Sequence, residues 1–359
     1  MSSIYGHTFT IDIFGESHGS NIGVVINGLP SGVKLDMDKI QAFMDRRRAG
    51  GETWSTKRRE ADIPRIVSGF YNGRTTGTPL CMLLDNADTK SKDYQQGINR
   101  PGHAEYTGNV RYGGFADPRG GGHFSGRLTA PLVFAGAVAA QILEDKGIYA
   151  ATHISQIAGV FDNAFDLVSI TKQESDRLKT MRLALNSEGC KQKMEQCIMD
   201  AASAGDSVGG EIECAVLGVP AGIGSPMMDG VESRLSSLIF SVPAVKALSF
   251  GAGNAFAGMK GSEANDAYTM DGDKITAKTN NNGGLIGGIT NGMPIVFRTV
   301  IKPTASIPLP QQTVNLVSKQ QETLKVQGRH DPCIVPRAVP VIEAAACICI
   351  LDMMMERGH

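Results

Sequence analysis

The sequence predicts an α+β protein in which a helical core is shared by two half-structures. Residues 127–147 and 337–358 are apolar nearly all round, as fully buried helices are. Residues 63–86 and 283–303 read as strand–turn–strand units, the first with an Asn–Gly turn. No linker-like stretch divides the 359 residues, so we expect one domain over 1–359.

The other elements follow from hydrophobic periodicity. Residues 7–15 and 22–32 read as two strands around a short loop, and 209–220 as another strand. Helices are expected within 35–51, 189–206 and 229–242, where apolar side chains recur at helical spacing. Both all-apolar helices follow an Arg, a short spacer and a Pro, which is a weak sign of an internal pseudo-repeat.

The charge distribution points to a small anionic ligand. The net charge is −1, which implies no bulk attraction to nucleic acid or membrane. Eleven of the 18 arginines lie in residues 1–130, and five of them in 45–62. That run contains one aromatic residue, Trp54, so bidentate recognition of carboxylate or phosphate is favoured over nucleic-acid binding.

The cysteines and the N-terminus predict a soluble, cytoplasmic chain. The seven cysteines form no paired framework, as expected of free thiols in a reducing compartment. The first ten residues lack the pattern of a signal peptide. Residues 339–355 contain two acidic residues and are shorter than the ~20 residues that a membrane span needs. The seven histidines show no ligand spacing, so no metal site is expected.

The stretch "GESHG" at residues 15–19 has three interpretations. Its spacing matches the Gly-x-Ser-x-Gly elbow of hydrolases, but a strand follows where the elbow needs a helix. His18 could simply cap a hairpin, or it could deliver a proton to a bound ligand.

Three further motifs lie in glycine-rich or polar segments. Arg100 and His103 flank a rigid Pro–Gly turn; a lone histidine there is more often structural, but the two side chains together are also what an anion site would show. The glycines of 117–127 precede a buried helix and could cradle phosphate or form a flexible turn. Asp331 could be a base beside a cation, a helix cap or a salt-bridge partner. Residues 85–126 have little regular pattern and are interpreted as a functional loop.

Taken together, these segments resemble the chorismate synthase family. The matching motifs occur in the family's order along essentially the whole chain: "FGESHG", "GLPSG", "DRRRAGG", "STKRRE", "SGFYNGRTTGTP", "RPGHAEY", "RGGGHFSGRLTAP", "IGGITNGMPIVFRTVIKPTASI" and "GRHDPCIVPRAVPVIEA". The resemblance implies a βαβ sandwich, with a central helical layer between antiparallel sheets.

The activity that the resemblance implies is the anti 1,4-elimination of phosphate from 5-enolpyruvylshikimate 3-phosphate. The product would be chorismate, in the last common step of the shikimate pathway, and reduced FMN would be required without net redox change. An external flavin reductase, or another reductant derived from NAD(P)H, is expected to supply the reduced flavin. A homotetramer is also implied.

The resemblance also implies roles for single residues. His18 would be the general acid near the phosphate, His103 would maintain the protonation state of the flavin, and Asp331 would relay the ring proton. The expected substrate contacts are Ser17, Arg47, Arg100, Arg127 and Arg329. The expected flavin contacts are His123, Phe124, Ser125, Pro243, Ala244, Gly287, Lys302, Pro303, Thr304, Ala305, Ser306 and Arg329.

Some positions depart from the family's common pattern, namely Thr53, His123, Phe124 and Pro243. A protein that keeps the scaffold but only binds an anion or a nucleotide is therefore the rival hypothesis. The presence of His18, His103 and Asp331 together argues against it, because binding alone needs none of them.

Overall fold

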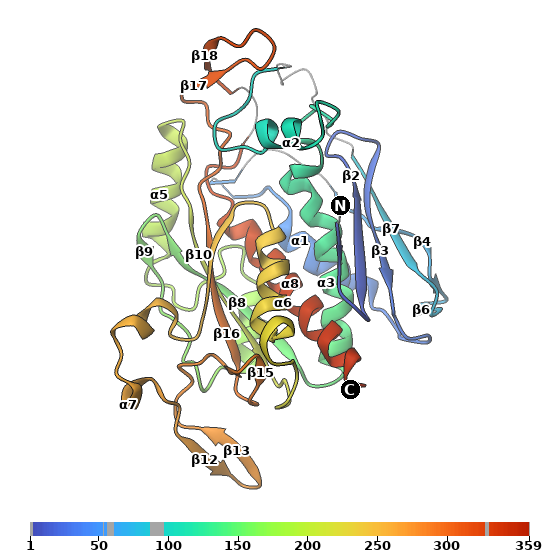
Figure 1. The fold of residues 1–359 in the computed structure, drawn as a ribbon, viewed down its shortest axis with the longest axis vertical. Helices are drawn as coiled ribbons and strands as arrows, with labels where there is room; N and C mark the ends of the chain where they lie inside the picture. The colour runs from blue at the N-terminus through green and yellow to red at the C-terminus, as the bar shows by residue number, and fades with distance from the viewer. Residues whose placement is uncertain (1–2, 53, 56–60, 87–96, 327–329, 359) are drawn as a thin grey trace.

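Two five-stranded antiparallel sheets enclose a layer of helices in the computed structural model of the protein (Figure 1). The structure describes residues 3–52, 54–55, 61–86, 97–326 and 330–358. One hydrophobic core extends from the first sheet through the helices to the second sheet. The predicted sandwich is confirmed.

The first sheet has the order β1-β2-β3-β7-β4. It consists of β1 (Ile4–Tyr5), β2 (Thr10–Gly15), β3 (Asn21–Asn27), β7 (Leu80–Asp85) and β4 (Arg65–Ser68). Along β7, Leu80, Met82 and Leu84 are buried and alternate with more exposed residues, which is the pattern of a sheet with one face on the core. The predicted Asn72–Gly73 turn joins β5 (Phe70–Tyr71) to β6 (Arg74–Thr75), and both turn residues have positive φ.

The second sheet has the order β11-β16-β10-β8-β9. It consists of β11 (Val245–Phe250), β16 (Ile295–Ile301), β10 (Gly210–Leu217), β8 (Tyr149–Ile157) and β9 (Val160–Phe161). The strand β8 is not among the elements that the sequence predicts. It is buried along most of its length, because α4 (Lys172–Lys179) packs on it as well as the central helix α8, so no alternating pattern arises.

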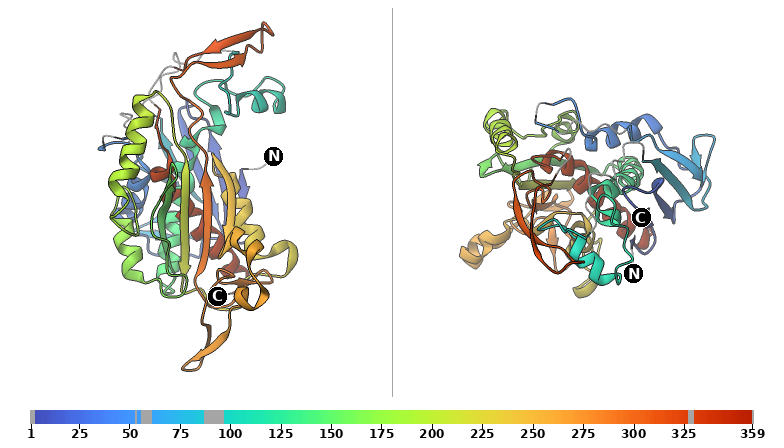
Figure 2. Two further views of the ribbon diagram at one scale, coloured as in Figure 1. Left: turned by 90° about the vertical axis from the view of Figure 1, so that its left-hand side faces the viewer. Right: turned by 90° about the horizontal axis from the view of Figure 1, so that it is seen from above.

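The helical layer is built on α3 (Thr129–Glu144) and α8 (Val335–Glu356), with α1 (Met37–Arg47) and α6 (Val231–Ser241) beside them (Figures 1 and 2). A Cβ at Gly136 of α3 would lie 2.2 Å from the Cβ of Ala344, so the two long helices cross at very close range. The faces predicted for α1 and α6 are the buried ones.

The helix α8, with 22 residues, is long and apolar enough to cross a membrane, and so is the 19-residue helical stretch Gly126–Glu144 that ends with α3. Residues 339–355 therefore belong to a helix that is not too short to span a membrane, and the expectation from length was wrong. Burial decides the matter, since 83% and 89% of the two apolar windows lie inside the protein, as in core helices. All seven cysteines are free thiols, as expected.

The remaining elements lie around this sandwich. The helix α2 (Glu105–Arg111) lies in the segment that was expected to be irregular. The hairpin β12–β13 (Tyr268–Asp271, Lys274–Ala277) projects from one end of the molecule, and β17–β18 (Gln311–Val314, Gln321–Leu324) from the other (Figure 1). The others are α5 (Lys191–Ser203), α7 (Gly261–Ala264), β14 (Leu285–Ile286), β15 (Ile289–Thr290) and the short 3-10 helices η2 (Gly122–Phe124), η3 (Gly126–Leu128), η4 (Met227–Asp229) and η5 (Gly253–Gly258).

The order of elements along the chain bears on the predicted pseudo-repeat. A long apolar helix follows the strands of each sheet, α3 after the first and α8 after the second. A duplication would produce this arrangement, and the repeat stays a prediction.

Candidate active site

A cavity of about 1090 Å³ brings together residues that are far apart in the sequence. His18, His103 and Asp331, the three predicted catalytic residues, all line it. The loop after β2, the end of α1, the start of α3 and the start of α8 meet there, next to α2 (Figure 1).

A run of three glycines lies between the two predicted catalytic histidines. A Cβ at Gly120 would lie 2.5 Å from Nε2 of His18, and one at Gly121 would lie 3.3 Å from Nε2 of His103. Gly120, Gly121 and Gly122 all have positive φ, and Gly122 accepts a hydrogen bond from the backbone N–H of Ser17 at 3.1 Å. Glycine is needed here because the backbone must approach both imidazoles closely.

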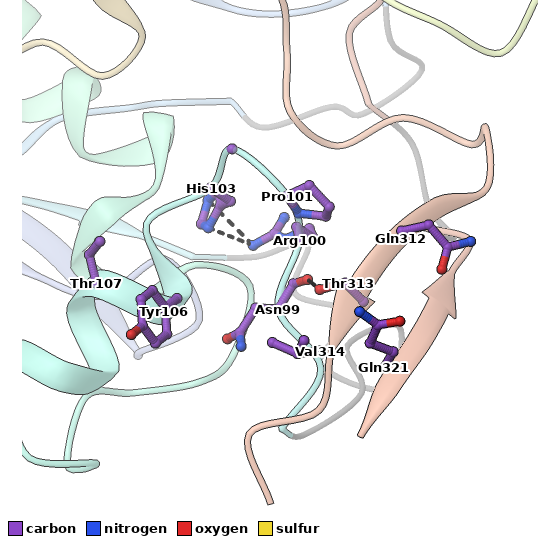
Figure 3. Close-up of a pocket in the computed structure, with 11 residues that line it drawn as sticks. Asn99, Arg100, Pro101, His103, Tyr106, Thr107, Gln312, Thr313, Val314 and Gln321 are labelled. Atoms are coloured by element: carbon purple, nitrogen blue, oxygen red, sulfur yellow. Dashed lines mark hydrogen bonds between the residues drawn. The ribbon is translucent and has the colours of Figure 1, made fainter. Parts of the chain in front are cut away.

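Arg100 and His103 face each other on the predicted turn, which Figure 3 shows beside β17 and β18. Nη2 of Arg100 lies 3.3 Å from Nδ1 of His103. Burial and the Arg100 charge lower the pKa of His103 to about 4. The imidazole is therefore neutral at pH 7. A smaller pocket of about 410 Å³ opens beside the same turn (Figure 3).

Arg100, an expected substrate contact, has protein partners of its own. Its Nη2 lies 2.5 Å from Oε1 of Glu105, and its Nη1 donates to Oγ of Ser306 at 2.8 Å. Lys302 also donates to the carbonyl of Gly102 at 2.5 Å. The 100–103 turn and the 302–306 segment are thus joined across the cavity by side-chain hydrogen bonds.

Arg47 and Arg127, two further expected substrate contacts, share one carboxylate. Nη2 of Arg47 lies 2.5 Å from Oδ2 of Asp62, and Nη1 of Arg127 pairs with Oδ1. Both arginines line the cavity, and Nε of Arg47 is buried with no hydrogen-bond partner among the described residues. An unpartnered donor at a cavity wall is what a site for an anionic ligand requires.

Asp331 forms an ion pair with Arg337, in the first turn of α8. Nε of Arg337 donates to the carbonyl of Arg47 at 2.9 Å, so the same guanidinium also reaches the end of α1. A cation does lie beside Asp331, namely Arg337, and this ion pair suits both a base held beside a cation and a salt-bridge partner. Arg329 lies outside the described residues, as does Thr53.

The expected flavin contacts line the cavity, except for Gly287 and for Arg329, which lies outside the described residues. Pro243, Ala244 and the whole of 302–306 line it, as do His123, Phe124 and Ser125. His123 uses both ring nitrogens within the protein, at 2.6 Å from Oγ of Ser3 and 2.8 Å from the carbonyl of Gly15. Gly287 does not line the cavity but lies in the β14–β15 turn, where a Cβ would meet no atom within 4 Å.

The cavity wall fits a phosphate-bearing ligand. The hydroxyls of Ser17 and Thr304 are buried there and make no hydrogen bond to any residue that the structure describes. Burial lowers the pKa of Lys302, and the positive charge of Lys246, which lies close by, lowers it further. Lys246 lies where the register between β11 and β16 shifts. Such an irregularity redirects a side chain.

Sequence reasoning missed four residues of this region, namely Asp62, Lys246, His330 and Arg337. All but Asp62 line the cavity. His330 lies within the "GRHDP" motif and Arg337 lies close to it, so proximity to this motif was the signal that could have identified them.

The other interpretations of the motifs find less support. Within the part of the chain that the structure describes, the Ser17 hydroxyl has no hydrogen-bond partner, so none of these residues is placed as the base that a hydrolase would require. Among the described residues, His7, Asp229 and Glu356 could together hold a metal ion. Arg234 pairs with both carboxylates and already supplies positive charge there.

A cavity lined by arginine, lysine and histidine at the end of a βαβ sandwich is a site suited to an enzyme of small anionic substrates. The chain matches the family described as Chorismate synthase over residues 9–355. It is 41% identical to the chorismate synthase of Dehalococcoides mccartyi, with 100% of this chain and 98% of that protein covered. It is 43% identical to that of Chitinophaga pinensis, with 98% and 96% covered.

A solved structure described as chorismate synthase has the same fold, with a TM-score of 0.76 at 24% identity over 98% of this chain and 93% of the other. The chain belongs to the chorismate synthase family and is therefore an enzyme of the shikimate pathway to aromatic amino acids.

Proposed function

We propose that this enzyme is a lyase that forms chorismate from 5-enolpyruvylshikimate 3-phosphate by anti 1,4-elimination of phosphate. The observation that carries the proposal is that His18, His103 and Asp331 line one cavity together with Arg47, Arg100 and Arg127. A substrate with two carboxylates and a phosphate matches that excess of cationic side chains.

His18 is the proton donor to the departing phosphate. It is buried beside Gly120, next to the unpartnered hydroxyl of Ser17, so a phosphate at this point would have a donor on each side. A donor held in place can contribute on the order of 10²–10⁴ to the rate.

Asp331 and His103 handle the ring proton and the cofactor's protonation state. The Arg337 ion pair orients the Asp331 carboxylate. His103 is neutral, so it can accept a proton or a hydrogen bond inside a cationic cavity.

The cofactor is reduced FMN, which Pro243, Ala244 and the 302–306 segment of the cavity lining would hold, and Lys246 and Lys302 would supply positive charge for its phosphate. When bound, it supplies electron density to the substrate ring as the C–O bond breaks. An external flavin reductase, or another NAD(P)H-derived reductant, provides its reduced form in the cytoplasm, and the enzyme works as a homotetramer.

The test is an anaerobic assay of phosphate release and chorismate formation with FMN reduced by dithionite. We expect phosphate release to be stoichiometric with chorismate formation and to require the reduced flavin. Release without flavin would overturn the cofactor assignment. Binding of the substrate without any release would instead indicate a non-catalytic anion-binding protein.

A further inference from the structure

We propose that Asp62 is a positioning residue of the substrate site, whose carboxylate sets the spacing of Arg47 and Arg127. The proposal rests on the proposed function, because it concerns the arginines that would bind the anionic substrate. Asp62 itself is not among the residues that line the cavity.

The geometry assigns one carboxylate oxygen to each arginine. Oδ2 lies 2.5 Å from Nη2 of Arg47, and Oδ1 pairs with Nη1 of Arg127. The Asp62 side chain is fully buried, and the two arginine side chains are 4% and 2% exposed. A short, buried carboxylate between two planar guanidinium groups leaves little freedom in their separation.

The charge balance shows why a carboxylate is needed there. Two buried guanidinium groups side by side repel each other, and both burial and the Arg127 charge disfavour the charged form of Arg47. With Asp62 the group of three carries a net charge of +1, so it still attracts an anion. Burial alone would raise the pKa of Asp62, but the two arginines lower it, so it remains ionised.

The surrounding contacts hold this group from several sides. Nε of Arg127 donates to Oδ1 of Asn86 at 3.1 Å, and Gln41 of α1 donates to the Asp62 carbonyl at 3.5 Å. Asp62 has a φ of +48°, in the left-handed region that few non-glycine residues adopt. Its carboxylate is therefore held in place by the fold before any ligand arrives.

The test is Asp62→Asn, which keeps the shape and removes the charge. Binding of 5-enolpyruvylshikimate 3-phosphate is measured by calorimetry with oxidised FMN, so that no turnover occurs, and KM and kcat are measured with reduced FMN. The substitution adds a net positive charge, which by itself would tighten the binding of an anion. If Asp62 positions the arginines, Kd and KM nevertheless rise by about 10- to 100-fold, while kcat changes less.

Glu213→Gln is the matched control. Glu213 is also a fully buried carboxylate between two cationic groups, His153 and Arg298, but it lies in β10 and does not line the cavity. It should lower stability without changing Kd. In an Arg127→Gln background, Asp62→Asn should cost much less affinity, because the two residues act as a unit.

Unchanged or tighter substrate binding by Asp62→Asn would overturn the proposal, and so would an equal loss of affinity in Glu213→Gln. If the Asn variant does not fold, Asp62→Glu keeps the charge and moves it by one methylene. A Glu variant with wild-type Kd would also overturn the proposal.

A wild-type protein that binds the substrate without turnover would contradict the proposed function alone. If the wild type does not bind 5-enolpyruvylshikimate 3-phosphate, the Kd for inorganic phosphate is compared among the wild type and the same variants instead.

Discussion

Single residues in the cavity owe their properties to a few close neighbours. His103 is neutral because it is buried beside Arg100, and Arg100 is held by Glu105 and Ser306. Asp331 is held by Arg337 in the same way. The neutral state of His103 therefore depends on its buried surroundings and on the neighbours that hold Arg100 in place.

His103→Ala and Asp331→Ala should each lower turnover by roughly 10²–10⁴ without loss of the fold. The measurement is kcat with reduced FMN, together with the thermal midpoint. His7→Ala is the control, because its exposed side chain does not line the cavity. A variant at 103 or 331 with full activity would remove that residue from the mechanism.

Gly120→Ala should lower turnover because the new Cβ would lie 2.5 Å from the His18 ring and must displace it. A misplacement of about 1 Å can cost on the order of 10²-fold in rate. Gly114→Ala is the control. Gly114 also has positive φ, but its nearest neighbour would be 3.8 Å away, so the variant shares the backbone strain and should retain kcat. Equal activities of the two variants would contradict the role of Gly120.

At the scale of secondary-structure elements, the long helices with an apolar face were predictable, whereas the short helices α2 and α4 and the buried strand β8 were not. The buried residues of α1 are Ile40, Phe43, Met44 and Arg47, at the spacing that the sequence shows. The strand β8 has no alternation because helices cover both of its faces. The helix α2 escaped prediction because it is short and mostly exposed, with only Gly108 buried.

Gly136→Ala tests the crossing of α3 and α8. Ala would normally favour a helix over Gly by about 0.5–1 kcal/mol, but here its Cβ would lie 2.4 Å from the Cα of Ala344. The net change should be a loss of about 1–3 kcal/mol in the free energy of unfolding, measured with urea. At Gly189 a Cβ would meet nothing within 4 Å, so Gly189→Ala should stay within about 0.5 kcal/mol of wild type. If Gly136→Ala instead had a higher free energy of unfolding than the wild type, α3 and α8 would have to move apart easily to accept the new Cβ.

At the scale of the whole molecule, buried ionic groups tie together parts that the hydrophobic core does not order by itself. Asp352 of α8 accepts hydrogen bonds from the backbone N–H groups of His7, Thr8 and Phe9, which fixes the start of the first sheet. In the second sheet, His153 lies 3.1 Å from Asp162 and 2.9 Å from Glu213. Such groups make stability depend on pH.

His153 should make the protein less stable as the pH rises above 6.5. Burial alone would lower its pKa, but the two carboxylates raise it above the ordinary 6.5. The charged form then stabilises the fold fully below pH 6.5, and this contribution is lost as the pH rises through the folded-state pKa. His103 has a pKa of about 4, so it makes the protein more stable as the pH rises, but only between about pH 4 and 6.5. It therefore does not affect the pH dependence above 6.5.

The measurement is the free energy of unfolding from pH 6.5 to 9 for the wild type and for His153→Gln. The variant should be less stable at pH 6.5 and show a flatter pH dependence above it. Each unit of pKa shift corresponds to about 1.4 kcal/mol. Parallel curves for the two proteins would show that His153 is not charged in the fold.

The sequence by itself determined which segments are buried helices, where the arginines concentrate, and which family the chain resembles, because these depend on local periodicity and on motifs. Only the tertiary structure decided that Asp62 lies between Arg47 and Arg127, that Arg337 pairs with Asp331, and that Gly120 and Gly121 separate two histidines. Gly287, which the resemblance placed at the flavin, lies away from the cavity. Contacts of this kind join side chains from different elements. Their partners are selected by how the helices and sheets pack, and no pattern within one segment encodes that packing.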